Sequence, residues 1–335
     1  MSILPRYSSR YPRQGKFAIL CEGDLAGYEA DLLEKWFALQ NPHIFIDVWP
    51  CGTKTAIFGM ADALGRAISF SVIEDRDYRT IEQARNDCDA SLSDRKDRGT
   101  HVRSWRTWYR HEIENYFIEP EVVAPVLAQW FGTTEREVVN RLEQVIARSA
   151  IDQAAQFALS CLRSSLPDAQ KSVGGIPRAG ARPQWSDKDG AIVAPDREIV
   201  QQKLTEVVEA SWKRFSDNTQ KIDPTVILNS FTTRANSWSN IKLSDQAWRC
   251  DWAGKEILQS LCRWLAGEFG WPVENGGSRI PVSWSGLKRQ QSDEKDREIA
   301  FALEKDLTTA FLDHLKSAAH SDIRKEWDEI VQSVR

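Results

Sequence analysis

Acidic side chains follow two short apolar runs in the first quarter of the chain. Glu22 comes directly after Lys16–Cys21, and Asp75 and Asp77 come shortly after Ala67–Ile73. If both runs are parallel strands, their carboxyl ends meet at one edge of a sheet, where sites form in open α/β folds. An extended backbone would also point Asp75 and Asp77 to the same side of the chain. These three acids are therefore candidates for one shared site.

Carboxylates gathered at one edge repel one another unless a cation lies between them. Mg²⁺ suits such a group, because it prefers hard oxygen ligands and binds through a few carboxylates together with substrate phosphate. A bound ion can activate water and neutralise charge on phosphorus, and two ions can hold the attacking and leaving oxygens. The acids thus predict a phosphodiester-cleaving site that uses Mg²⁺ or Mn²⁺, as one or two ions.

A third acidic segment, His111–Tyr116, follows a run at Val102–Arg110 that is expected to form a fourth strand. Glu112 and Glu114 would share one side of an extended backbone and could join the same site as metal ligands. The pattern also fits the first turn of a helix with solvated acids, because a helix N-terminus favours negative charge. His111 is interpreted as a structural residue or a phosphate contact.

The elements that would position these acids alternate along the first 120 residues. Strands are expected at residues 16–21, 43–49, 67–73 and 102–110, helices at 25–39 and 56–64, and a charged loop before the fourth strand. Strands separated by helices of this length indicate βαβ units and a parallel sheet. The first predicted domain, residues 1–120, is therefore α/β, a small parallel sheet flanked by helices, with a basic N-terminal arm.

From about residue 121 the pattern becomes helical. Thr134 and Glu137 have the spacing of a capping box that opens a run through Ile146, and Asp223-Pro224 is typical of a helix start. Further helices are expected at residues 251–266, 299–315 and 323–334, and exposed connections at 174–195 and 285–297. The second predicted domain, residues 121–335, is mostly α-helical and would serve dimerisation, substrate binding or partner docking.

Composition excludes several classes of protein. The 335 residues are 41% hydrophobic and 27% charged, as in an ordinary globular protein. No stretch approaches the roughly 18 apolar residues that span a bilayer, and the N-terminus lacks the apolar core of a signal peptide, so we expect a cytoplasmic protein. The six cysteines form no CxxC pair, which argues against a zinc site or a disulfide framework. Basic residues at 6–16 and 95–110 could hold phosphates or be solvated, despite a net charge of −4.

These residues together resemble the Toprim domain, specifically its OLD-like branch of bacterial anti-phage nucleases. The resemblance covers about residues 16–120 and rests on three stretches, FAILCEGDLAGYEADLL, FSVIEDRDYR and RHEIENYFIEP. The last stretch looks like the AriB-type Toprim nucleases of the two-component PARIS defence system. In that system the nuclease partners an ABC-type ATPase (AriA-like).

The resemblance implies a role for each acid. Glu22 would be a metal ligand or a general acid/base, and Asp75 and Asp77 would bind metal. Glu114, with Glu112 as second choice, would complete a second metal site.

The resemblance also implies a lysine near the chemistry and a biological setting. Lys255, which follows a glycine at an expected helix start, is the preferred candidate, and Lys54 is the other. The chain would be a toxic effector released from its ATPase partner, acting as a homodimer on RNA such as tRNA, with DNA as the alternative.

Two other interpretations stay open. The Asp75-x-Asp77 spacing also marks haloacid dehalogenase phosphatases, but there it ends the first strand and is followed by Thr or Val, where this chain has Arg79. A Toprim-like core that only binds nucleic acid or a partner is the non-enzymatic alternative, although a phosphate-binding surface gains nothing from clustered carboxylates. The chain has no P-loop motif, so it is not a full OLD protein with its own ATPase.

Overall fold

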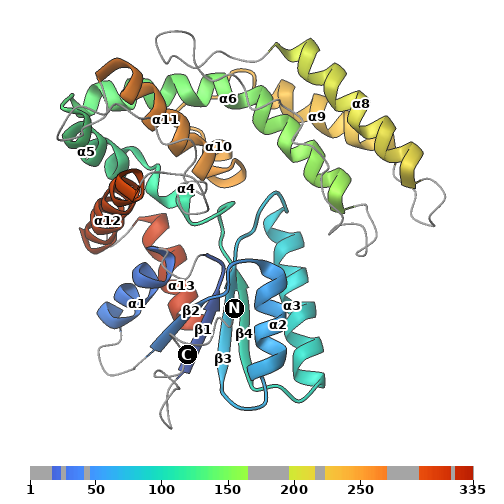
Figure 1. The fold of residues 1–335 in the computed structure, drawn as a ribbon. Coiled ribbons are helices and arrows are strands. Elements are labelled where there is room, and N and C mark those ends of the chain that lie inside the picture. Colours follow the sequence, from blue (N-terminus) through green and yellow to red (C-terminus); the bar gives the residue numbers. More distant parts are fainter. Residues whose placement is uncertain are drawn as a thin grey trace. The chain divides into compact units, whose positions relative to one another are not determined.

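The computed structural model describes residues 17–23, 28–40, 46–164, 196–215, 223–269, 294–317 and 321–334 (Figure 1). By contact the chain divides into two compact units. Unit 1 comprises the residues up to Tyr116 together with Glu304–Arg335, and unit 2 comprises Phe117–Leu303. The last helices, which the sequence pattern assigned to the helical domain, therefore belong to the unit that contains the sheet.

Unit 1 is built on a parallel sheet of four strands. They are β1 (Phe17–Cys21), β2 (Ile46–Pro50), β3 (Phe70–Glu74) and β4 (Val102–Thr107), in the order β2-β1-β3-β4. β1 and β3 are buried along their whole length, as expected for central strands of a parallel sheet. The predicted parallel sheet is confirmed. Because the chain passes from β1 outward to β2 and back across to β3, the carboxyl ends of β1 and β3 form a switch point, the usual place for a site.

Helices cover both faces of this sheet. They are α1 (Tyr28–Gln40), α2 (Lys54–Leu64), α3 (Ile81–Asp97) and α13 (Asp322–Val334). Because the crossovers are right-handed, α1, which connects β1 to β2, lies on one face of the sheet. The next two helices, α2 and α3, lie on the other face. Figure 1 shows this arrangement, with α1 and α13 beside one face and α2 and α3 beside the other.

The charged loop expected before β4 is instead the helix α3, so that prediction was wrong. Its 17 residues bury only a narrow stripe that includes Ala84 and Cys88, and charged side chains cover the rest. So few buried apolar residues do not give the sequence the apolar repeat of 3.6 residues by which a helix is recognised. The start signal was in the sequence, because Thr80 and Gln83 form a reciprocal capping box with distances of 3.1 and 3.0 Å.

An aromatic cluster holds the C-terminal helices in unit 1. The Trp327 ring of α13 lies with its centroid 4.8 Å from Trp108, 5.1 Å from Phe311 and 5.5 Å from Tyr116. It also meets Trp36 of α1 edge-on at 6.4 Å. The cluster joins segments that are far apart in the sequence, which is why no local pattern assigned α13 to the sheet.

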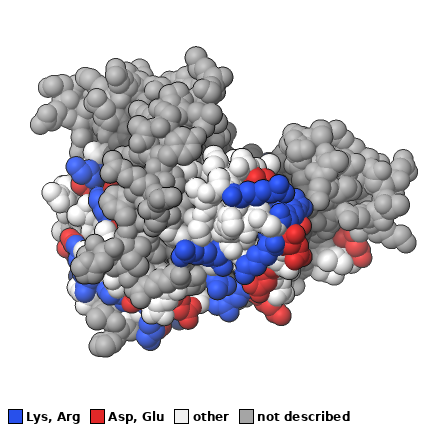
Figure 2. Space-filling model, turned by 90° about the horizontal axis from the view of Figure 1, so that it is seen from below, with Lys and Arg blue, Asp and Glu red and all other residues white. Residues whose placement is uncertain are grey.

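The basic stretch at residues 95–110 does not form one basic surface. Trp105 and Trp108, which could have stacked on bases, are fully buried in the core. Arg95 is also buried and pairs with Asp94 at 2.9 Å. On the face seen in Figure 2, Lys and Arg side chains of the described surface gather with Asp and Glu beside them.

Unit 2 is helical throughout its described residues. It contains α5 (Pro120–Phe131), α6 (Glu135–Ser164), α8 (Arg197–Phe215), α9 (Pro224–Trp238), α10 (Gln246–Asp251) and α11 (Gly254–Phe269), while α4 (Glu114–Phe117) leads into it and α12 (Glu294–Ser317) leads out. The long helix α6 contacts α5, α8, α9 and α11. The mostly helical character predicted from the sequence is confirmed.

Two predicted helix starts of unit 2 are correct. The Glu137 amide donates to Thr134 Oγ1 at 3.2 Å, and the Thr225 amide donates to Asp223 Oδ1 at 2.8 Å. The N-terminal arm and the connection at 174–195 lie outside the described residues, as does most of the connection at 285–297, whose last four residues belong to α12. Among the described helices, none combines the length and apolar character needed to cross a membrane.

Replacing Trp327 by alanine tests the role of the aromatic cluster. The loss of a fully buried indole should lower the free energy of unfolding by about 3–5 kcal/mol. Urea unfolding measures this change, with Val226→Ala on the exposed side of α9 as the control. A loss below about 1 kcal/mol, the size of an ordinary substitution, would show that α13 does not depend on this packing.

Candidate active site

Glu22 and Asp75 meet where β1 and β3 end. Pairing of the two strands places Cys21 opposite Ile73, so the residues that follow emerge at the same edge. Glu22 Oε1 accepts a hydrogen bond from the Asp75 amide at 3.0 Å. The geometry thus brings together two acids that are 53 residues apart in the sequence.

Asp77 leaves this edge in a different direction from the one expected. Its φ of +54° lies in the left-handed region, so the extended backbone assumed for residues 75–77 was wrong. The Asp77 amide donates to the His111 carbonyl at 2.8 Å, and the Arg79 guanidinium closes the turn on the Asp75 carbonyl at 2.9 Å. The Asp77 side chain is therefore half exposed, while Asp75 Oδ1 is sealed from solvent.

Lys54 lies between two of the acids. Its ammonium forms an ion pair with the Asp77 carboxylate and lies 3.8 Å from Glu22 Oε1. Lys54 is the first residue of α2, which Thr53 caps, and a bridge between Gly23 and Gly52 ties the ends of β1 and β2 together. Gly52 has a φ of +88°, a backbone conformation that favours glycine. The turn after β2 thereby delivers a positive charge to the acids.

Lys255, the preferred lysine of the sequence analysis, belongs to unit 2. It is the second residue of α11, which begins at Gly254, three residues later than the helix expected from residue 251. Of the two candidates, Lys54 is the one that unit 1 itself places beside Glu22 and Asp77.

Glu112 and Glu114 reach the acids from a turn and a helix. β4 ends at Thr107, so the extended reading of residues 111–116 was wrong, and Glu114 instead opens α4. The helical alternative had expected solvated acids, but Glu114 is buried and hydrogen-bonds with the Tyr28 hydroxyl. Both carboxylates help to raise the pKa of Asp75, which means that they lie near it.

Two further acids of this site were missed. Glu29 lies in the first turn of α1 and is buried, and it too raises the pKa of Asp75. Glu304 of α12 is buried and, after burial itself and Glu114, contributes to raising the pKa of Tyr28. Glu29 stands on the same helical face as Leu32, Leu33 and Trp36, and an acid on an apolar face is a signal that could have identified it.

The electrostatics of the site are those of crowded, poorly solvated carboxylates. Burial raises the pKa of Asp75 well above its usual range, and Glu22 and Glu29 are the next largest causes. Burial also raises the pKa of Glu22 to about 7, although the Lys54 ammonium acts in the opposite direction. Within the described part of the chain, Asp75 Oδ1 has no hydrogen-bond partner.

His111 is a neutral side chain next to these charges. Burial lowers its pKa to about 4, against the influence of Asp77. Its ring meets Tyr78 edge-on with the centroids 4.2 Å apart. A neutral, buried imidazole agrees with a structural or phosphate-contacting role better than with a charged one.

The acids at this edge are of the type that binds magnesium, but their side chains are not arranged around a metal ion. Among the described residues, no three His, Cys, Asp or Glu side chains converge closely enough to hold a metal ion. The carboxylates of Glu22, Asp75 and Asp77 are nevertheless hard oxygen donors, and the unpartnered Asp75 Oδ1 is one that a cation would satisfy. These three residues could hold Mg²⁺ if it replaced the Lys54 ammonium between them.

Comparison with known proteins gives no family assignment. No protein-family model matches the chain, and no curated protein or solved structure is significantly similar to it.

The raised pKa of Glu22 predicts a pH-dependent stability. A folded-state pKa of about 7, above the ordinary 4.5, adds stability that is fully present at low pH and is lost as the pH rises through about 7. In chelator-containing buffer, Glu22→Gln should therefore be more stable than the wild type near pH 8, by at most about 3 kcal/mol, and equally stable near pH 4.

Urea unfolding at the two pH values measures this difference, with Glu143→Gln on the exposed side of α6 as the matched control. An equal effect of Glu22→Gln at both values would show that Glu22 titrates normally.

Proposed function

We propose that the chain is a metal-dependent phosphodiesterase of the Toprim type that cleaves nucleic acid. The observation that carries this proposal is the convergence of acids at the ends of β1 and β3, where Glu22 accepts from the Asp75 amide at 3.0 Å and Lys54 lies beside Glu22 and Asp77. A structural role gives little reason to gather so many acids, only part of whose charge Lys54 balances, at one edge of a sheet. A reaction in which a hard cation must be held beside a phosphate would explain why the acids are gathered there.

The residues of the site can be given roles on this proposal. Mg²⁺, held by Glu22, Asp75 and Asp77, would supply the activated water and the positive charge at the phosphate. If Glu22 does not bind the ion, its alternative role is that of a general acid/base, because in the metal-free site burial raises its pKa to about 7. Lys54 would turn from its acidic partners to a phosphate oxygen, because an ammonium binds either group as a point charge. Glu114 and Glu112, whose charges act on Asp75, would be the ligands of a second ion.

The biological setting of the proposal rests on the motif resemblance alone. We infer a toxic effector of anti-phage defence in the cytoplasm, held by an ABC-type ATPase and released as a homodimer. RNA such as tRNA is the favoured substrate, and DNA is the alternative.

A non-catalytic binding module is the second candidate, and one observation favours it. The Lys54 ammonium already neutralises Asp77 and approaches Glu22, so part of the acidic charge is balanced without a metal. If the chain only bound nucleic acid or a partner, the acids would have no chemical role.

Expression in bacteria separates the two candidates. Wild type, Glu22→Ala and Asp75→Ala would each be produced with and without a candidate ATPase, and total RNA and chromosomal DNA would be examined on gels. We expect specific RNA loss with the wild type and a fall of roughly 1,000-fold or more in both variants, because metal-binding acids act as one unit. Asp97→Asn, at the exposed end of α3, is the matched control.

Loss of DNA instead of RNA would support the assignment of the site and show that the substrate is DNA. Wild-type activity in either Glu22→Ala or Asp75→Ala would contradict the assignment of these acids. No damage to either nucleic acid, even after the partner is triggered, would favour the binding module.

The two lysines can be compared directly. Lys54→Met should lower the rate of cleavage by about 100-fold or more, because it removes a charge beside the reacting phosphate. Lys255→Met, in unit 2, should have a smaller effect. Cleavage rates of the purified proteins on one oligonucleotide measure the two effects. A larger loss of rate in Lys255→Met than in Lys54→Met would assign the catalytic role to Lys255.

A further inference from the structure

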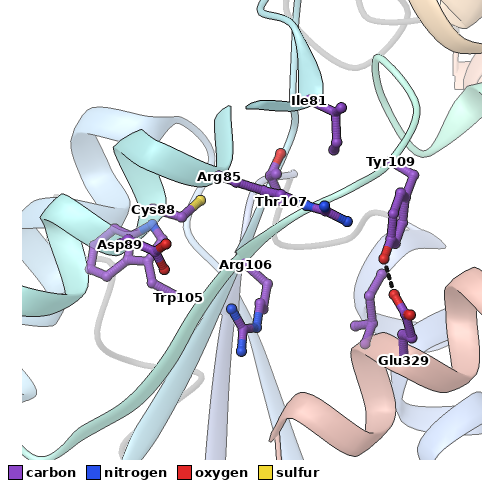
Figure 3. A pocket seen from close by; sticks show the side chains of 10 residues that line it. Ile81, Arg85, Cys88, Asp89, Trp105, Arg106, Thr107, Tyr109 and Glu329 are labelled. Atoms are coloured by element: carbon purple, nitrogen blue, oxygen red, sulfur yellow. Dashed lines mark hydrogen bonds between the residues drawn. The ribbon is translucent and has the colours of Figure 1, made fainter. Parts of the chain in front are cut away.

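A cavity of about 400 Å³ lies in unit 1 along the outer edge of β4 (Figure 3). β4 is the last strand of the sheet, so this edge has no strand partner among the described residues. α3 provides one wall of the cavity, the second half of β4 provides its floor, and α13 provides the other wall. Its volume lies in the range of about 300–1,000 Å³ that is typical of small-ligand sites.

Two arginines in this cavity have no acidic partner. Arg85 of α3 and Arg106 of β4 are exposed, and neither forms an ion pair with any described residue. Other arginines of unit 1 are paired, for example Arg79 with Glu74 at 2.8 Å and Arg98 with Asp94 at 3.0 Å. Unpaired guanidinium groups that line one cavity suit a phosphate, which a guanidinium can bind through two parallel hydrogen bonds.

A flat, fixed surface lies beside these charges. The Arg85 guanidinium lies over the Tyr109 ring, 5.0 Å from its centroid, and the Tyr109 hydroxyl donates to the Glu329 carboxylate of α13. Figure 3 shows the Arg85 side chain reaching from α3 toward Tyr109, with Arg106 projecting from β4. Planar guanidinium and aromatic groups of this kind are surfaces on which nucleic-acid bases stack.

The cavity lies next to the acids. β4 pairs directly with β3, the strand that leads to Asp75, and the Trp108 amide donates to the Glu74 carbonyl at 3.1 Å. Neighbouring strands are about 4.8 Å apart, so the cavity begins one strand beyond the acids. Thr107 and Tyr109 in its lining mark the carboxyl end of β4, which is the same edge of the sheet.

We infer that this cavity binds one nucleotide of the substrate strand, next to the phosphate that the acids cleave. Arg85 and Arg106 hold its phosphate, and the surface made by Arg85 and Tyr109 stacks its base. Asp89 and Glu329, which also line the cavity, can accept hydrogen bonds from an amino group of that base. This inference rests on the proposed function and adds to it the residues that position the strand.

An extended peptide that pairs with the free edge of β4 is the other class of ligand such an edge can take. The compact cavity, the two unpaired arginines and the stacking surface favour a nucleotide. A peptide is therefore an outcome of the test.

Binding without cleavage tests the inference. The full chain in chelator-containing buffer would be titrated into a short fluorescein-labelled single-stranded RNA, and into DNA of the same sequence, with anisotropy as the readout. Arg85→Gln combined with Arg106→Gln should weaken binding by about 10-fold or more and reduce the salt dependence by about two phosphate contacts. Tyr109→Leu should weaken binding by roughly 5- to 100-fold with little change in salt dependence.

Arg103→Gln is the matched control, because it removes an exposed arginine from the same strand outside the cavity. Circular dichroism and melting temperature would establish that each variant folds. If a variant does not fold, Arg106→Lys would be used in its place. This substitution keeps the positive charge but removes the planar guanidinium that forms two parallel hydrogen bonds, so it should still weaken binding by several-fold.

The outcomes separate this inference from the proposed function. Cavity variants that bind and cleave like the wild type, in a protein whose cleavage needs Asp75, would overturn the inference alone. Arginine-dependent binding in a protein that never cleaves would support the cavity and contradict the proposed function. Binding of an acidic peptide, with no oligonucleotide binding, would overturn the inference in favour of edge pairing.

Discussion

At the carboxyl ends of β1 and β3, burial raises the pKa of Asp75, and the carboxylates of Glu22, Glu29, Glu114 and Glu112 raise it further. Like charges in a poorly solvated place repel strongly, because little water screens them. Such a group can exist only if protons, a lysine or a metal ion balance part of the charge. The rest of unit 1 can be understood as the frame that holds these groups together despite this repulsion.

Two consecutive acids at the end of β3 differ in how their carboxylates are satisfied. Glu74 is buried at the end of β3, where it accepts from Arg79 at 2.8 Å and from the Trp105 indole at 3.2 Å. Its charge is matched by a guanidinium, as buried charges usually are. Asp75, the next residue, has an oxygen that no described residue satisfies. Two consecutive residues therefore differ in that the charge of Glu74 is matched within unit 1, whereas one oxygen of Asp75 is left to a group that the described residues do not supply.

The frame is closed by residues from the far end of the chain. α13 contributes Trp327 to the aromatic cluster and Glu329 to the cavity beside β4. The same helix therefore stabilises unit 1 and shapes the surface next to the acids. A substitution that loosens α13 would for this reason disturb both the fold and the cavity.

The sequence by itself determined the four strands, their parallel pairing and the helix starts at Thr134 and Asp223, because apolar runs and caps are local signals. It also led to Glu22 and Asp75, since parallel strands end at a common edge. Only the tertiary structure decided that Asp77 takes a left-handed turn, that Lys54 reaches the acids, and that α12 and α13 supply residues to unit 1. Those outcomes depend on contacts between distant segments, which no local period or spacing records.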